Sequence, residues 1–241
     1  MRIRCVILWR TGTLDSRMHT PATKPTASDA VYACVRQRII SNQLPGGSQL
    51  LEEDVAEELS VSRTPVRAAL LRLETEGLVQ AVRRHGYRIT PITVDDIREI
   101  YQVLSPLETV AAELLATKDP NGDEVQALQD CVDRMDESLR RDDLQAWADA
   151  DELFHSRLVD LCGNARLARA AKMMFAQSHR VRVFTLRLRD KPVGSVKRHG
   201  DLVDAIRQRR PQLAREIHGA HRDAWTQTLG KLLTSLNIHQ L

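Results

Sequence analysis

The pattern of apolar residues downstream of Pro91 constrains the fold more than any other feature of the sequence. Apolar side chains recur there every three or four residues almost to the end of the chain, which is the spacing of one helix face. Helices joined by short breaks bury their apolar faces against one another, so an antiparallel all-helical bundle is expected. Breaks containing Pro, Gly or Asn divide the region into six predicted helices, at about residues 93–117, 121–139, 143–162, 165–189, 193–209 and 211–236.

The segment from about Ala27 to Ile92 follows a different pattern. Three shorter helices are expected, the first two separated by the Pro- and Gly-rich turn Leu44–Leu50 and the third capped by the side chain of Ser62. Val79–Val82 and Tyr87–Ile89 can then pair as two short strands. Three helices followed by a hairpin form a winged helix-turn-helix. The chain is therefore predicted to be mainly α, with a winged helix-turn-helix followed by the bundle.

The third of these short helices presents basic side chains on one face. Its apolar residues between positions 66 and 73 recur at i, i+3, i+4 and i+7, so they share a buried stripe. Arg63, Thr64 and Arg67 lie off that stripe in the first turns, where a helix entering the DNA major groove presents its side chains. Pro65 is tolerated in the first turn. A lone helix of this kind is more often a solvated surface helix, but the hairpin behind it favours DNA binding.

The hairpin is basic, and its tip is predicted to be Arg84, His85 and Gly86, placed to reach the DNA backbone or the minor groove. The net charge of the whole chain is only +3. Even so, basic residues concentrate in the winged segment, and such clustering raises affinity for phosphate and makes binding steeply salt-dependent. The clustered residues are Arg63, Arg67, Arg72, Arg83, Arg84 and Arg88.

Composition excludes several other classes of protein. Only 4% of residues are aromatic, which argues against a single-strand binder that stacks bases. The cysteines are scattered without a CxxC pair, so neither a thiolate zinc site nor a disulfide framework is expected. No stretch is apolar enough to span a membrane, and a cytoplasmic location is predicted. Residues 1–26 are expected to be a disordered tail, within which Met18 is an alternative start. The cysteines are Cys5, Cys34, Cys131 and Cys162.

Four residues of the bundle form a candidate metal site. Asp151 and His155 are spaced i, i+4, so both project from one helix face, while His199 and His221 lie on later helices. Three imidazoles and a carboxylate suit a divalent transition metal, zinc foremost, with nickel, manganese or iron also suited. Spacing alone leaves other interpretations open, because bundle histidines are often surface or core residues and Asp and His at i, i+4 can be a simple ion pair.

The segment from Ala27 to Pro91 resembles the DNA-binding domain of the GntR family of bacterial transcription regulators. The resemblance rests on Leu44-Pro45-Gly46-Gly47, on Ser62-Arg63-Thr64-Pro65-Val66-Arg67 and on Glu76-Gly77-Leu78-Val79. It implies that Arg63, Thr64 and Arg67 contact bases and phosphates and that His85-Gly86 form the wing tip. Many relatives carry an arginine in the second helix, where this chain has the acids Glu52, Glu53 and Asp54.

The bundle resembles the FCD ligand-binding domain of the FadR subfamily, through DELFHSRLVDLCGN (Asp151 to Asn164), HGDLVDAI (His199 to Ile206) and His221. In members with these residues, an Asp and three His bind a metal facing an internal cavity, which implies Asp151, His155, His199 and His221 as ligands. One departure stands out: Leu104 lies where relatives often carry an arginine, followed by an acid that matches Glu108. Arginines considered as substitutes are Arg157, Arg180, Arg182 and Arg187.

These resemblances predict a two-domain regulator of transcription that is not an enzyme. A tail (1–26), a winged domain (27–92) and an effector-binding, dimerising domain (93–238) are expected. A homodimer would place two recognition helices on a palindromic double-stranded operator. A small molecule in the bundle, expected to be an organic acid, would control the affinity of a repressor for that operator. Two alternatives remain at this point: a regulator for which the ion is the signal, and a metal-dependent hydrolase.

Overall fold

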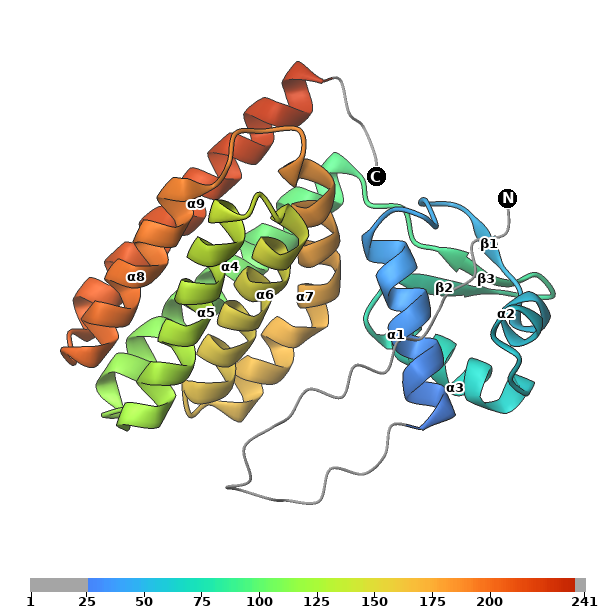
Figure 1. The fold of residues 1–241 in the computed structure, drawn as a ribbon, viewed down its shortest axis with the longest axis horizontal. Helices are drawn as coiled ribbons and strands as arrows, with labels where there is room; N and C mark the ends of the chain where they lie inside the picture. The colour runs from blue at the N-terminus through green and yellow to red at the C-terminus, as the bar shows by residue number, and fades with distance from the viewer. Residues whose placement is uncertain (1–25, 237–241) are drawn as a thin grey trace.

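The computed structural model describes residues 26–236 and shows two units side by side, a small mixed unit and a larger helical bundle (Figure 1). Both halves of the predicted architecture are confirmed: within the described range the chain forms helices apart from one small three-stranded sheet. The predicted tail, except Thr26, lies outside the described residues, as does the choice between Met1 and Met18. The end of the expected second domain at residue 238 also lies outside them.

The first unit contains three helices and the sheet. Strand β3 lies in the middle of the sheet and pairs antiparallel with both neighbours, in the order β1-β3-β2. Strand β1 was not predicted, because two residues with one buried side chain carry no periodicity and Leu50 is placed by its pairing with Tyr87, far along the chain. The elements are α1 (Ala27–Ile40), β1 (Gln49–Leu50), α2 (Glu52–Leu59), α3 (Arg63–Thr75), β2 (Val79–Val82) and β3 (Gly86–Ile89).

The apolar stripe of α3 lies where the sequence places it. Val66, Ala69, Leu70 and Leu73 are fully buried and pack in one core with residues of α1, so the opposite face of α3 is left to solvent. The expected cap of this helix is wrong in one respect. Ser62 stands at the N-cap with an extended backbone, but its side chain makes no capping hydrogen bond.

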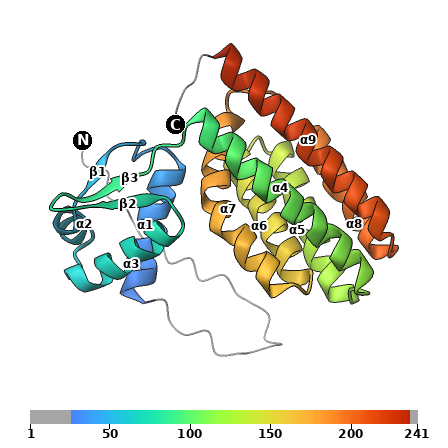
Figure 2. The same cartoon turned by 180° about the vertical axis from the view of Figure 1, so that it is seen from behind.

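The second unit is a bundle of six helices among the described residues (Figure 2). Capping boxes start two of them, at Thr93 with Asp96 and at Asn121 with Glu124. Helix α4 packs along α9, while α5 packs against α6, and a continuous apolar core runs between them. The helices are α4 (Val94–Thr117), α5 (Gly122–Arg140), α6 (Leu144–Leu161), α7 (Ala165–Leu186), α8 (Val193–Arg207) and α9 (Pro211–Ser235).

Helix α7 joins the bundle to the first unit, and both ribbon views place it on the side that faces α1. Its Ala176 belongs to the core of the first unit, and its Val183 packs against that core. The buried Arg180 donates a hydrogen bond to the backbone carbonyl oxygen of Thr90, in the connection between the two units. A shift of α7 would therefore alter the packing of both units.

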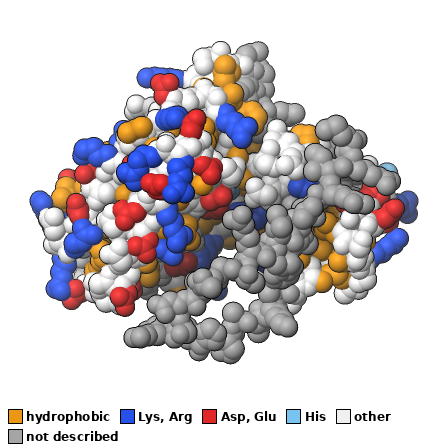
Figure 3. Space-filling model, in the orientation of Figure 1, with side chains coloured by type: hydrophobic (Ala, Val, Ile, Leu, Met, Phe, Trp, Pro, Cys, Tyr) orange, Lys and Arg blue, Asp and Glu red, His pale blue; other side chains and the backbone are white. Residues whose placement is uncertain are grey.

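The visible face of the bundle mixes Lys and Arg with Asp and Glu and shows no patch of one sign (Figure 3). Between residues 26 and 236, no helix is both long and apolar enough to cross a lipid bilayer.

Candidate nucleic-acid interface and candidate metal centre

The outer face of α3 presents the predicted DNA-contacting residues to solvent. The side chains of Arg63 and Arg67 are 66% and 70% exposed, Thr64 is exposed, and Pro65 is half-buried in the first turn. A helix with one buried stripe and an exposed basic face at its N-terminal end has the form of a major-groove recognition helix.

Acidic residues of α2 form ion pairs with these arginines. Arg67 makes a two-pronged contact with Glu52, with Nε 3.1 Å from Oε1 and Nη2 2.8 Å from Oε2. Arg63 Nη2 lies 3.4 Å from Glu53 Oε2. The hydrogen bond from Arg67 lowers the pKa of Glu52, so this carboxyl is ionised at neutral pH. Glu52 and Glu53 thus partly neutralise the basic face of α3 in this structure.

The wing is a tight turn between β2 and β3. Arg84 has a left-handed backbone with φ 66°, and Gly86 follows with φ 72°. A Cβ on Gly86 would lie 2.8 Å from the Leu50 carbonyl oxygen, so only glycine fits beside β1 at this position. Arg84 and His85 are exposed, and Gln49 donates a hydrogen bond to the His85 carbonyl. The structure therefore places the three predicted tip residues at the end of an exposed, well-defined hairpin.

The four candidate metal ligands come together in the bundle core from α6, α8 and α9. Asp151, His155, His199 and His221 are each at most 8% exposed. His155 Nε2 lies 3.3 Å from His199 Nε2. Asp151 Oδ1 lies 3.5 Å from His199 Nε2, and Asp151 Oδ2 lies 3.8 Å from His155 Nε2. One ring nitrogen of each histidine falls within 4.8 Å of those of the other two.

The protonation of these histidines suits a cation. Burial lowers the pKa of His155, His199 and His221, so the rings are neutral near pH 7. His199 Nδ1 lies 2.8 Å from the Ser195 carbonyl oxygen and must donate to it, which leaves a lone pair on the Nε2 that faces Asp151. Neutral imidazoles with free lone pairs beside a carboxylate are what a transition metal requires.

A second buried cluster lies behind His155. Glu108 of α4 is fully buried and forms an ion pair with Arg222 of α9, and its Oε1 lies 3.3 Å from His155 Nδ1. Burial raises the pKa of Glu108, although Arg222 opposes that shift. His218, left out of the predicted ligands, is buried here too, within reach of Glu108 and His155, and its Nδ1 pairs with the Thr109 hydroxyl at 3.0 Å.

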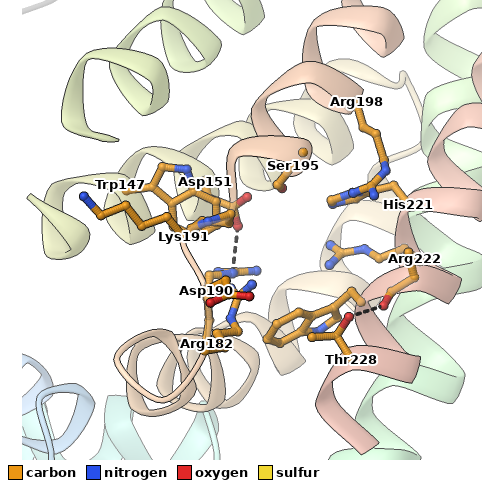
Figure 4. Close-up of a pocket in the computed structure, with 15 residues that line it drawn as sticks. Trp147, Asp151, Arg182, Asp190, Lys191, Ser195, Arg198, His221, Arg222 and Thr228 are labelled. Carbon is orange, nitrogen blue, oxygen red and sulfur yellow. Dashed lines mark hydrogen bonds and ion pairs between the residues drawn. The ribbon is translucent and has the colours of Figure 1, made fainter. Parts of the chain in front are cut away.

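A cavity of about 190 Å³ opens beside the candidate metal site (Figure 4). Asp151 and His221 line it, together with Arg182, whose Nε lies 2.7 Å from Asp151 Oδ2, and Arg222. Leu104 is fully buried elsewhere in the core, so the basic groups of the cavity come from other helices.

Only one of the arginines considered as substitutes lines this cavity, namely Arg182. Arg157 instead donates to the Ala127 carbonyl, Arg180 to the Thr90 carbonyl, and Arg187 is exposed. Sequence reasoning did not single out Arg222, Arg189 or Arg198, which do line the cavity. The only available signal was position, since Arg222 follows His221 and Arg198 precedes His199.

The donor set fits a divalent transition metal. Zinc binds histidine nitrogen at about 2.0–2.1 Å, so two such nitrogens at a tetrahedral centre lie about 3.4 Å apart. The 3.3 Å separation of His155 Nε2 and His199 Nε2 agrees with that spacing. Asp151 supplies an oxygen on the same side, so the residues present fit the predicted ion.

Comparison with known proteins defines the class. Residues 27–89 match the bacterial regulatory proteins of the gntR family, and residues 99–224 match the FCD domain. The chain belongs to the GntR family of transcriptional regulators and carries an FCD domain. It is a regulator and not an enzyme, so the hydrolase alternative falls away.

Two relatives illustrate the match. An HTH-type transcriptional regulator in the TAR-I ttuE-ttuC′ intergenic region of Agrobacterium vitis is 41% identical over 132 residues, which cover 54% of this chain and 77% of that protein. The gluconate operon transcriptional repressor of Bacillus licheniformis is 36% identical over 129 residues, which cover 53% of this chain and 52% of the repressor.

Solved structures share the fold. McbR/YncC of E. coli superposes with a TM-score of 0.73 at 17% identity and covers 86% of this chain and 98% of its own. A GntR transcriptional regulator from Rhodococcus sp. RHA1 gives a TM-score of 0.69 at 22% identity, with 84% and 96% covered. At these identities the likeness concerns the fold alone.

Proposed function

We propose that this regulator is a repressor whose affinity for operator DNA is set by a small organic acid bound beside a divalent transition metal in the bundle. The observation that carries the proposal is the convergence of three buried imidazoles and one carboxylate, of which His221 and Asp151 also line a cavity that contains several arginines. Zinc is the foremost candidate, and nickel, manganese or iron also suit the ligands. Placement in the metal-binding type of the FadR subfamily is part of the same proposal.

When bound, the ion supplies a Lewis-acidic anchor for a carboxylate oxygen. Asp151, His155, His199 and His221 would hold it, and Ser195 fixes the ring of His199 through its carbonyl. Glu108 would orient His155 once a metal is bound, because a ring that offers Nε2 to a metal carries its proton on Nδ1 and can donate it to Glu108 Oε1, 3.3 Å away. Without a metal the same Nδ1 can instead accept from Arg222 Nη2, which lies 3.0 Å from it.

The cavity favours an effector over the alternative in which the ion itself is the signal. A site built only to sense a metal needs no further space, whereas about 190 Å³ adjoins these ligands. Among the relatives, one is named as the repressor of a gluconate operon, and gluconate is a carboxylate. That name supports both repression and an acidic effector for this chain.

A connected set of charged contacts links the cavity to the DNA-binding unit. Arg182 of α7 holds Asp151, and His179, one turn earlier, lies 3.4 Å from Glu152. Glu152 in turn holds Arg36 of α1 at 2.7 Å. A ligand that moves Asp151 or Arg182 would therefore also shift Glu152, the residue next to Asp151, whose carboxylate holds Arg36 of α1. Affinity for DNA changes only as far as the ligand distinguishes the two arrangements of the units.

The operator is proposed to be palindromic and read by a homodimer, each copy placing α3 in a major groove. Arg63, Thr64 and Arg67 would meet bases and phosphates, with Pro65 holding the first turn, and Arg84, His85 and Gly86 would meet the backbone or the minor groove. All the side chains in this set other than those of Pro65 and Gly86 are exposed.

The test starts from DNA selected out of a random duplex library by the full-length protein. Metal content is measured by mass spectrometry, and affinity for the selected duplex is measured with zinc, after chelation, and with small carboxylates. Zinc bound one per chain, with DNA affinity that responds to an acid only in the zinc-loaded protein, is the expected result.

Two outcomes redirect the proposal. DNA affinity that follows zinc alone, with no response to any acid, would favour the metal sensor. If a His199→Ala variant binds zinc as tightly as the unaltered chain, the proposed metal site is wrong. His85→Ala, which changes an exposed wing histidine, serves as the matched control for zinc binding.

A further inference from the structure

The lining of the cavity contains hydrogen-bond donors that the protein does not satisfy. Buried nitrogens without a protein partner occur on Trp147, Arg189, Arg222 and Trp225, and all four residues line this one cavity. Indole and guanidinium nitrogens can donate but not accept. Buried donors are normally paired, so their concentration here points to a ligand with several acceptor oxygens.

The basic groups of the cavity are not all neutralised by the protein. Arg189 and Arg198 have no carboxylate within ion-pair distance among residues 26–236. Of the two acids that line the cavity, Asp151 pairs with Arg182, and Asp190 forms no ion pair within that range. Positive charge therefore exceeds negative charge before any metal is counted. The cations already held by carboxylates are Arg182 by Asp151, Arg222 by Glu108 and Lys191 by Asp142.

Arg189 is fixed in place by an aromatic stack. Its guanidinium carbon lies 4.6 Å from the centre of the Trp225 ring, and Trp225 meets the Tyr101 ring edge-on at 6.1 Å. Burial, and then the neighbouring Arg182, lower the pKa of Arg189, so an anion at this point would relieve an unfavourable environment. The stack holds the guanidinium beside an indole N–H that also needs an acceptor.

Helix α9 sets the distance from this group to the metal ligands. His221 and Trp225 are four residues apart on α9 and so lie on the same helix face, about 5–6 Å apart at their Cβ atoms. A short diacid spans such a distance. The cavity, at about 190 Å³, is also smaller than the pockets that hold drug-sized ligands.

We propose that Arg189 and the indole N–H of Trp225 form a second anion subsite, so that the effector is a short-chain dicarboxylate. One carboxylate is directed at the Asp151, His155, His199 and His221 centre, and the other is held by Arg189. This inference rests on the proposed effector function. It assigns a binding group to the second carboxylate of the effector, which the metal does not contact.

The test compares acids that differ only in the second carboxylate. Binding of glutarate and valerate, and of succinate and butyrate, to the full-length zinc-loaded protein is measured by titration calorimetry. Each diacid should bind at least about tenfold more tightly than its partner, as expected for one charge-assisted contact. Arg189→Gln should remove most of that preference.

Trp225→Phe and Arg169→Gln complete the design. The phenylalanine keeps an aromatic ring against Tyr101 but lacks the N–H, so it should reduce the preference by less than Arg189→Gln does. Arg169 is exposed on α7 and away from the cavity, so its variant should behave as the unaltered protein.

Equal affinity for diacids and monoacids would overturn the proposed subsite. An equal loss of the diacid preference in Arg169→Gln and Arg189→Gln would also overturn it, as would failure of every acid to bind. A separate titration of the protein with zinc shows whether the metal site exists, so failure of the subsite can be distinguished from failure of the metal proposal. A diacid preference that depends on Arg189 in protein that binds no zinc would uphold the subsite and reject the metal anchor.

Discussion

An arginine facing a glutamate occurs in both units of the molecule, in opposite surroundings. Arg67 and Glu52 meet at the exposed face of the recognition helix, where the arginine side chain is 70% exposed. Arg222 and Glu108 meet in the bundle core, where the two side chains are 3% and 0% exposed. Water screens the first pair, and an exposed pair contributes about 0–1 kcal/mol. Neither member of the second pair can be left alone without a large cost in free energy.

The difference indicates what each pair can do. The carboxylate at the surface can be exchanged for a phosphate or a base at little cost, which suits a face that must bind and release DNA. The pair in the core fixes the position of α4 relative to α9 and supports His155 behind the candidate metal site.

The largest expected effect comes from breaking the buried pair. Arg222→Ala should lower the free energy of unfolding by about 3–5 kcal/mol, because Glu108 is left buried without its counter-charge. Chemical denaturation of the full-length protein measures this. Arg215→Ala is the matched control on the same helix, since Arg215 pairs with Glu113 at the surface and should cost no more than about 1 kcal/mol. Equal losses in the two variants would contradict the comparison.

The next effect concerns metal affinity. Glu108→Gln should weaken zinc binding about 10–100-fold, because the Nδ1 proton of His155 then meets a neutral amide in place of the carboxylate that orients it. Competition with a chromophoric chelator measures the change in folded protein. Glu113→Gln removes an acid from the surface of the same helix and should leave zinc affinity unchanged. If both variants bind zinc like the unaltered chain, Glu108 has no orienting role.

The same contrast separates what the sequence could predict from what it could not. The stripe at Val66, Ala69, Leu70 and Leu73 and the long helices of the bundle were predicted because apolar periodicity is local. Strand β1 was not, since Leu50 is placed by a partner far along the chain. The spatial meeting of the four candidate ligands followed from family resemblance rather than from spacing.

The partners around that centre depend on packing between distant helices, which no local pattern records. Glu108 meets Arg222 only because α4 lies along α9, and Arg189 meets Trp225 only because the segment that follows α7 lies against α9. The capping hydrogen bond predicted for Ser62 shows that a local pattern can also predict a contact that does not form. A suitable residue at a suitable position does not ensure that its side chain turns toward the helix.

At the DNA-binding face, Arg67→Ala should weaken binding to the selected duplex by about 1–3 kcal/mol, the range for a lost bidentate contact to a base. Fluorescence anisotropy measures the affinity. Arg98→Ala, an exposed arginine of α4, controls for the loss of one positive charge. Unchanged affinity of Arg67→Ala would remove this residue from the recognition set.

The smallest expected effect tests whether the surface pair is exchangeable. Glu52→Gln keeps the size of the side chain but removes the charge that holds Arg67, so binding to the same duplex should strengthen by up to about 1 kcal/mol. Because exposed charges are screened by salt, the gain should shrink as salt is raised from low to physiological concentration. Glu57→Gln, an exposed acid on the same helix with no ion pair to α3, should give a smaller gain. A loss of affinity in Glu52→Gln would mean that Glu52 positions Arg67 for DNA rather than competing with it.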